Sequence, residues 1–212
     1  MDDDAFLIDA ILGDNADPLE SDAIPAARAH RATARRRFER VGQQQALSDV
    51  LAGPPAAGET VHLLSDAKFD FWTWVPVLIG WLGRVDALYC STWTLSRTTV
   101  TELAELWDAG KIGPGGVHFL TGLYFKRRET AVYTALLQTI RSRGGHYLAF
   151  RNHAKLLLLS NAKARHYLTV EGSANLTANP RAEQYALTND RRLHAFYRRW
   201  FEEMTLKTKP EP

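Results

Sequence analysis

Residues 153–175 constrain the fold more than any other part of the chain. They contain two apolar, strand-like runs, residues 156–159 and 167–170, with a short polar turn between them. Apolar runs on either side of a turn are typical of paired antiparallel strands. Such a hairpin brings the chain back to the edge where it started, so the residues before the first strand meet those after the second.

The residues at the two ends of this hairpin suit a phosphate group. His153 and Lys155 are two positions apart in an extended segment, so both side chains point to the same face. Gly172, Ser173 and Asn175 follow the second strand, where small residues let polar groups approach a ligand closely. An imidazole can attack phosphorus or donate a proton, the lysine supplies charge, and the hydroxyl and amide supply donors. The segment predicts a phosphodiester-cleaving site.

This pattern resembles the signature of the phospholipase D superfamily, H-x-K followed by G-S-x-N. The resemblance extends over residues 60–205 approximately, and Ser160 occupies the position where the family usually has an Asp. It implies an α/β fold and a metal-independent reaction through a phosphohistidine on His153, with no cofactor. A third group should orient the imidazole, and Glu183 is the candidate, a role that the family also gives to an acidic residue in this region.

One imidazole cannot be both nucleophile and leaving-group acid in the same step, and the chain has only one H-x-K motif. Other histidines lack the accompanying lysine, among them His62, His118, His146, His166 and His194. The simplest solution is a symmetric homodimer that places two His153 side chains face to face.

The region around this motif predicts an α/β fold, with a mostly parallel sheet flanked by helices and a motif-bearing hairpin. Strand patterns and helix patterns alternate along the chain, which favours parallel pairing and a ligand site at the carboxyl ends of the strands. The expected strands are residues 61–65, 85–91, 117–121 and 147–150, and the expected helices are residues 69–82, 98–109, 129–143 and 193–204.

Residues 1–58 are expected to form a helical N-terminal extension, and residues 59–212 the catalytic domain. A helix is predicted over residues 26–51, because they are rich in Ala, Arg and Gln and a Gly-Pro-Pro stretch follows. Residues 1–22 contain eight acidic and no basic side chains. The next segment carries Arg28, Arg31, Arg35, Arg36, Arg37 and Arg40. These arginines are candidates for nucleic-acid contact, or the two charged segments neutralise each other or a neighbouring chain.

Four further residues are expected to contact the substrate at the carboxyl edge of the sheet. Thr92 and Trp93 follow the second predicted strand, and Lys126 and Arg127 follow the third. Basic residues interleaved with aromatic ones suit the backbone and bases of a single strand. In contrast, the tryptophans of residues 69–82 are expected in the core or in an interface between chains.

Composition narrows the class of protein. The 212 residues include 45% hydrophobic residues, enough for one substantial core, and a single cysteine, which fits a reducing compartment. Neither a signal peptide nor an apolar run long enough to cross a bilayer is visible, so we expect a cytoplasmic protein without membrane insertion. The leading function is a nuclease acting on DNA or RNA. Alternatives are a nucleic-acid-binding protein that has lost turnover, favoured by Ser160, and a phosphodiesterase for lipids or small molecules.

Overall fold

The computed structural model describes residues 30–32, 36–41, 44–65, 70–177 and 181–206. Its described strands form one sheet of nine, in the order β1-β2-β3-β9-β8-β7-β4-β5-β6. The strands are β1 His30–Ala32, β2 Arg36–Val41, β3 Thr60–Ser65, β4 Ala87–Ser91, β5 Val117–Gly122, β6 His146–Phe150, β7 Leu156–Asn161, β8 His166–Gly172 and β9 Glu183–Asn189. The helices are α2 Gln44–Leu51, the 3-10 turn η2 Phe71–Thr73, α3 Trp74–Leu82, α4 Arg97–Asp108, α5 Leu123–Arg128, α6 Thr130–Ser142 and α7 Arg191–Leu206.

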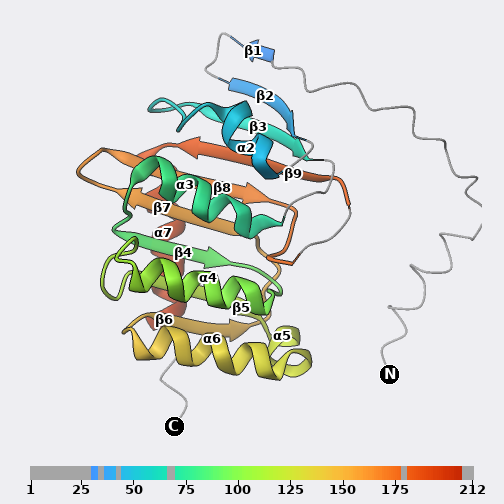
Figure 1. Ribbon diagram of the computed structural model, residues 1–212, viewed down its shortest axis with the longest axis vertical. Coiled ribbons are helices and arrows are strands. Elements are labelled where there is room, and N and C mark those ends of the chain that lie inside the picture. The colour runs from blue at the N-terminus through green and yellow to red at the C-terminus, as the bar shows by residue number, and fades with distance from the viewer. Residues whose placement is uncertain (1–29, 33–35, 42–43, 66–69, 178–180, 207–212) are drawn as a thin grey trace, which may run out of the picture.

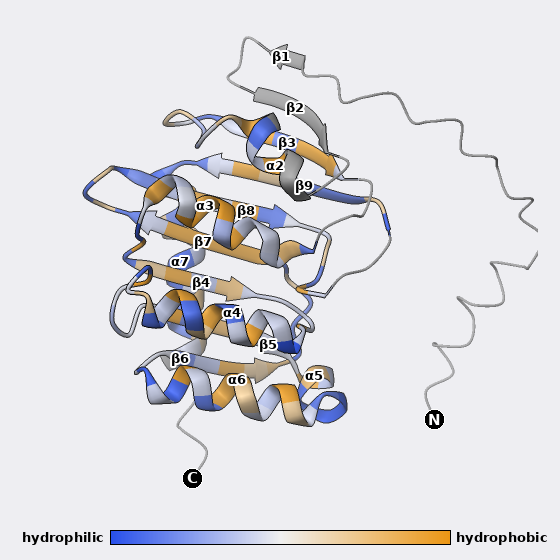
Figure 2. Ribbon diagram, in the orientation of Figure 1, coloured by the Kyte–Doolittle hydropathy of each residue, from blue (hydrophilic) through white to orange (hydrophobic). Residues whose placement is uncertain are grey.

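Helices lie on both faces of this sheet. Helices α3, α4 and α6 cover one face, and α7 lies behind the other face, against β5 to β8 (Figure 1). Hydrophobic residues gather in the central strands and in α3 (Figure 2). The run Leu156–Leu159 illustrates the layering. Leu157 and Leu159 pack in the cluster under α3 and α4, and Leu156 and Leu158 pack against α7, so a strand buried on both faces is apolar at every position.

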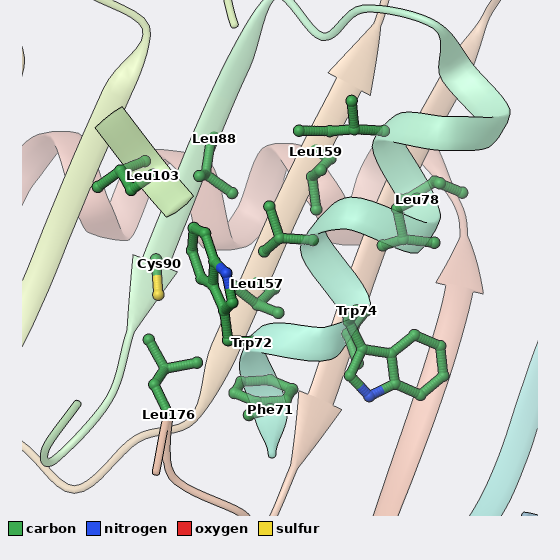
Figure 3. Packing of buried hydrophobic residues seen from close by; sticks show 14 of the residues in the cluster. Phe71, Trp72, Trp74, Leu78, Leu88, Cys90, Leu103, Leu157, Leu159 and Leu176 are labelled. Atoms are coloured by element: carbon green, nitrogen blue, oxygen red, sulfur yellow. The ribbon is translucent and has the colours of Figure 1, made fainter. Parts of the chain in front are cut away.

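The cluster under α3 and α4 is built around aromatic side chains. Phe71, Trp72 and Trp74 are buried there beside Leu157 and Leu176 (Figure 3). The expected place of Trp72 and Trp74 in the core is confirmed. Leu176 follows directly on the G-S-x-N sequence, so this core holds one arm of the motif in place.

The prediction of a mostly parallel sheet is wrong. Parallel pairing joins β2 to β3, β4 to β5 and β5 to β6, whereas the other five neighbouring pairs are antiparallel. The cause is the insertion of β7, β8 and β9 between β3 and β4. These three strands follow one another without an intervening helix, and strands joined in this way run antiparallel. Strand β9 was not predicted.

The prediction of a helix over residues 26–51 is also wrong for most of the residues that the structure describes in this range. Residues 30–32 and 36–41 are strands, and only Gln44–Leu51 is helical. Strand β2 pairs in parallel with β3, so the edge of the sheet decides its conformation against the helix propensity of the sequence. Residues 1–29 lie outside the described part of the chain, and the domain boundary near residue 58 stays a prediction.

This topology places the ends of the motif strands together. Strands β3, β4, β5, β6 and β8 end at one edge of the sheet, and β7 and β9 begin there. We call this the motif edge. The predicted hairpin is confirmed as β7 and β8, and the backbone N–H of Gly172 at its end donates to the Lys155 carbonyl at its start, at 3.3 Å.

Candidate active site at the motif edge

His153 and Lys155 lie in the connection from β6 to β7 and contact each other directly. The Lys155 ammonium is 2.8 Å from Nδ1 and 3.2 Å from Nε2 of His153, and it also donates to the His153 carbonyl at 2.8 Å. The imidazole is exposed, whereas Lys155 is only 9% exposed. The expectation that both side chains point the same way is met, and the accessible member of the pair is the predicted nucleophile.

Asn152 holds this connection in its shape. Its amide nitrogen donates to the Ser91 hydroxyl at 2.9 Å and to the Thr92 carbonyl at 3.2 Å, and its amide oxygen accepts from the backbone N–H of Ala154 at 3.0 Å. The Ser91 hydroxyl donates to the Ala154 carbonyl at 3.0 Å. Because these groups are buried, the backbone on both sides of His153 is fixed against the end of β4.

The pKa values of both motif side chains are lowered. Burial, followed by the charge of Lys155, lowers the pKa of His153 and favours the neutral imidazole that can act as nucleophile. Burial also lowers the pKa of Lys155, while the nearby Glu183 carboxylate opposes this shift. Among the described residues, no carboxylate lies within ion-pair distance of Lys155. The site therefore contains a buried cation whose charge is not neutralised by a protein ion pair.

The second arm of the motif comes from β8 and β9. The Ser173 hydroxyl donates to Glu183 Oε2 and accepts from the Gln184 backbone N–H at 3.1 Å. A Cβ atom at Gly172 would come within 2.7 Å of the Tyr185 ring, so glycine is required for β8 to approach this side chain. The expected contact of Glu183 with the imidazole is not formed. The Glu183 carboxylate instead accepts a hydrogen bond from the Ser173 hydroxyl, so orientation of His153 by Glu183 stays a prediction.

Asn175 lies next to this arm, where the chain leaves the hairpin. Its backbone carbonyl accepts from the Phe71 N–H at 3.1 Å, which ties the motif to η2. Its side-chain oxygen is buried and has no hydrogen-bond partner among the described residues. Buried amide oxygens are nearly always paired, so this amide is a candidate contact for a bound group.

The overall arrangement is similar to that of two solved structures. Polyphosphate kinase from Porphyromonas gingivalis aligns with a TM-score of 0.51 and 15% identity over 73% of this chain and 27% of the kinase. Nuc, a phospholipase D family member from Salmonella typhimurium, aligns with a TM-score of 0.47 and 13% identity, over 68% of this chain and 93% of Nuc. Neither a protein-family model nor a curated protein matches the sequence.

The protein has a phospholipase D-like fold. The kinase also has a phospholipase D-superfamily fold, and its alignment carries this conclusion. The likeness concerns the fold alone. The fold expected from the H-x-K and G-S-x-N motif is therefore confirmed as α/β and phospholipase D-like, and corrected in the direction of its strands.

In this phospholipase D-like fold, Ser160 is far from the motif edge. It lies on β7 near the hairpin turn and pairs with Ala87 and Tyr167. Five residues separate it from Lys155, which is roughly 17 Å along an extended strand. The absence of an Asp at this position does not alter the groups next to His153.

The four predicted substrate contacts differ in accessibility. Trp93 is half-buried and its ring lies 5.6 Å from that of His153, and Arg127 is exposed on α5. Lys126 is half-buried, with its ammonium 5.5 Å from the centre of the Tyr133 ring. Thr92 is fully buried, and its hydroxyl donates to the Thr94 carbonyl at 2.9 Å. The expected contact of Thr92 with substrate is therefore corrected to a structural role inside the loop after β4.

The predicted nucleic-acid-binding arginines are not part of the motif. Arg28 and Arg35 lie outside the described residues. Arg31, Arg36, Arg37 and Arg40 lie on β1 and β2, at the far end of the sheet, with β3 and β9 between them and β8. Their contact with nucleic acid stays a prediction.

Sequence reasoning missed two contributors to the site, and both left a signal. Asn152 directly precedes the H-x-K motif, and asparagine is a typical residue for fixing a turn through its side chain. Strand β9 buries Tyr185, Leu187 and Asn189 at alternate positions, which is the period of a strand, and Thr188 between the last two is buried as well.

Two further features of the described residues concern metal binding and membrane insertion. They contain no group of three or more His, Cys, Asp or Glu side chains placed to hold a metal ion. In the same part of the chain, none of the helices has the length and apolar character needed to cross a membrane.

Proposed function

We propose that the protein is a metal-independent phosphodiesterase, a nuclease that cleaves DNA or RNA through a phosphohistidine on His153. One observation carries this proposal: Lys155 is a buried cation that contacts His153 and has no ion-pair partner among the described residues. A buried charge without a counter-ion is costly, so a bound anion is the natural partner. The exposed imidazole beside it is then in reach of that anion.

The chemistry follows from these positions. The neutral His153 attacks phosphorus, a nitrogen–phosphorus bond forms, and the bond from phosphorus to the leaving oxygen breaks. Lys155 and the amide nitrogen of Asn175 stabilise the charge on the non-bridging oxygens, and Ser173 joins them when its hydroxyl turns away from Glu183. The leaving oxygen takes a proton from an acid on the opposite side. Water then attacks phosphorus and gives a proton to the conjugate base of that acid, while the nitrogen–phosphorus bond breaks. This releases the phosphomonoester end of the product and restores the imidazole.

A second copy of the chain is proposed to supply the acid. The described histidines other than His153 are less suited to this role: His194 is buried, His118 is half-buried, and His146 and His166 begin their strands at the opposite edge of the sheet. His30 lies on β1, and His62 lies on β3, with β9 between it and β8. A homodimer in which the partner subunit's His153 faces the same phosphate completes the reaction.

Nucleic acid is the proposed substrate because the motif edge is basic. Several exposed arginines follow or precede strands at this edge, namely Arg97, Arg127, Arg128, Arg151 and Arg181. A cluster of positive charge around the site attracts a polyanion and accelerates its encounter. Figure 2 shows the hydrophilic end of α5 that contributes two of these residues.

The deciding experiment uses pure protein with labelled single-stranded DNA, duplex DNA and RNA in EDTA. Cleavage is expected without added metal, and the reaction quenched in alkali should contain acid-labile label on wild-type protein but not on His153→Ala. Activity that EDTA abolishes and a divalent metal restores would contradict the proposal.

The dimer is tested by adding inactive His153→Ala subunits to wild type under exchange conditions. If both imidazoles serve one composite site, activity falls with the square of the wild-type fraction. A linear fall, or a fully active monomer, would show that each chain completes its own site.

A further inference from the structure

We propose that Tyr124 and Arg128, supported by Trp93, form a subsite in which one unpaired base stacks beside the phosphate held at His153. The inference rests on the proposed function and deepens it, because it specifies a single strand as the substrate.

The subsite is the outer end of a continuous ladder of planar groups. The Trp93 ring lies 5.6 Å from the His153 ring, and the Tyr124 ring is stacked on Trp93 with centroids 4.8 Å apart and planes 24° apart. The Arg128 guanidinium carbon lies 5.4 Å from the centre of the Tyr124 ring. The ladder begins at the proposed nucleophile and leads away from it along the motif edge, so a base at its outer end belongs to a nucleotide close to the scissile phosphate.

Packing of α5 does not require this tyrosine. The neighbouring Phe125 is completely buried and anchors the helix, whereas Tyr124 keeps 46% of its surface exposed. An aromatic side chain with nearly half of its surface in water gains little from burial, and its open surface is accessible to a ligand.

The backbone beside the ladder is shaped for it. A Cβ atom at Gly122 would lie 2.5 Å from Cδ1 of Trp93 and 3.0 Å from its carbonyl oxygen. Gly122 ends β5 immediately before α5, so only glycine lets Trp93 lie against the strand and support Tyr124.

A base can enter between Tyr124 and Arg128. Two van der Waals gaps of about 3.5 Å each require the planes to separate to roughly 7 Å. Arg128 is exposed and is the last residue of α5, so its guanidinium needs only a short movement from its present 5.4 Å. The base would then stack on the phenol ring and under the guanidinium, and such contacts accept any base.

Only an unpaired base can use this subsite. A base in a duplex is already stacked on both faces and must be extruded before it can stack on a side chain. The subsite thus favours single-stranded DNA or RNA over duplex, with little dependence on base identity.

Binding without turnover tests the subsite, using the His153→Ala protein as background. The probe is a short single-stranded oligonucleotide that carries 2-aminopurine, read by fluorescence, together with the same strand carrying abasic positions. Tyr124→Ala should weaken binding of the base-containing strand roughly tenfold or more, and Tyr124→Phe should stay within about twofold of the background. Both variants should bind the abasic strand as the background does.

Arg127→Ala and Arg128→Ala form a matched pair, because each removes one exposed charge from α5. Both should lower the salt dependence equally, and only Arg128→Ala should also reduce the preference for the base-containing strand over the abasic one. Equal effects of the pair on that preference, or equal loss for abasic and base-containing strands in Tyr124→Ala, would overturn the subsite. So would an absence of binding to any single strand.

Hydrolysis of bis(p-nitrophenyl) phosphate, a diester without bases, separates this inference from the proposed function. Wild type that hydrolyses the diester but shows no base-dependent binding retains the proposed function and loses the subsite. Protein with base-dependent binding that hydrolyses no phosphodiester keeps the subsite and loses the proposed catalysis.

Discussion

His153 at the motif edge and His118 beneath α7 both have a pKa below the ordinary value for histidine, but they are held in different surroundings. His153 is exposed, with the Lys155 ammonium on its ring nitrogens. His118 is stacked between Tyr89, at 4.4 Å, and His146, at 4.5 Å. Burial, followed by the charge of His146, lowers the pKa of His118 to about 4.

The same contrast extends to His194 on α7, whose ring lies edge-on to Tyr89 and Tyr167. Burial, followed by the charge of Arg198, lowers its pKa to about 4. Both His118 and His194 have a buried ring nitrogen without a hydrogen-bond partner among the described residues. A shifted histidine pKa therefore does not identify an active site in this protein. What distinguishes His153 is its access to solvent and its contact with an unneutralised cation.

The largest expected effect is the loss of activity on His153→Ala. Removing a nucleophile should lower kcat about 10⁴-fold, while the melting temperature changes little because the side chain is exposed. His118→Ala should do the opposite and destabilise the protein while kcat per folded molecule is kept. Steady-state kinetics measures kcat, and thermal unfolding measures the melting temperature, for both variants. Comparable losses of kcat in the two variants would remove the functional distinction between the two histidines.

A smaller effect, with opposite signs for activity and stability, is expected for Lys155→Met. The variant replaces a buried ammonium without an ion-pair partner by an apolar side chain of similar length. We expect kcat to fall about 10²-fold and the free energy of unfolding to rise by about 1 kcal/mol. Urea unfolding at neutral pH measures the second change. A less stable variant would mean that Lys155 contributes to the fold and is not held there for a ligand alone.

The effect that matters least at neutral pH concerns acid stability, and it belongs to the histidines under α7. Their folded pKa of about 4 lies below the unfolded value of about 6.5, so the unfolded state takes up protons first. Stability is fully present above pH 6.5 and falls as the pH approaches 4, by at most roughly 3 kcal/mol for each group. His118→Phe keeps an aromatic ring against Tyr89 and should flatten this fall. Urea unfolding between pH 7 and pH 4 tests it, and parallel curves for wild type and variant would exclude His118 as the cause.

Much of the candidate site could be predicted because its elements are local. The H-x-K and G-S-x-N sequences, the apolar runs between them and the polar turn are contiguous, so the geometry of a hairpin is enough to bring His153 and Lys155 near Gly172 and Ser173. Helices α4, α6 and α7 were also expected close to their observed bounds, because each carries its own helical period.

The other parts of the fold depend on pairing between strands that lie far apart in the sequence. Residues 36–41 favour a helix on their own, yet they form β2 because the edge of β3 offers backbone hydrogen bonds. The directions of β7, β8 and β9 depend on where the hairpin inserts into the sheet, which no local pattern reveals.

The sequence by itself determined which groups carry the chemistry: an imidazole, an ammonium, a hydroxyl and an amide at a fixed spacing around one hairpin. Only the tertiary structure decided how each is used. It buries Lys155 without a counter-ion, leaves His153 exposed, and turns Thr92 inward while Tyr124 stays at the surface. The physical reason is that spacing along one chain segment fixes neighbours, whereas desolvation and access depend on everything that packs around them.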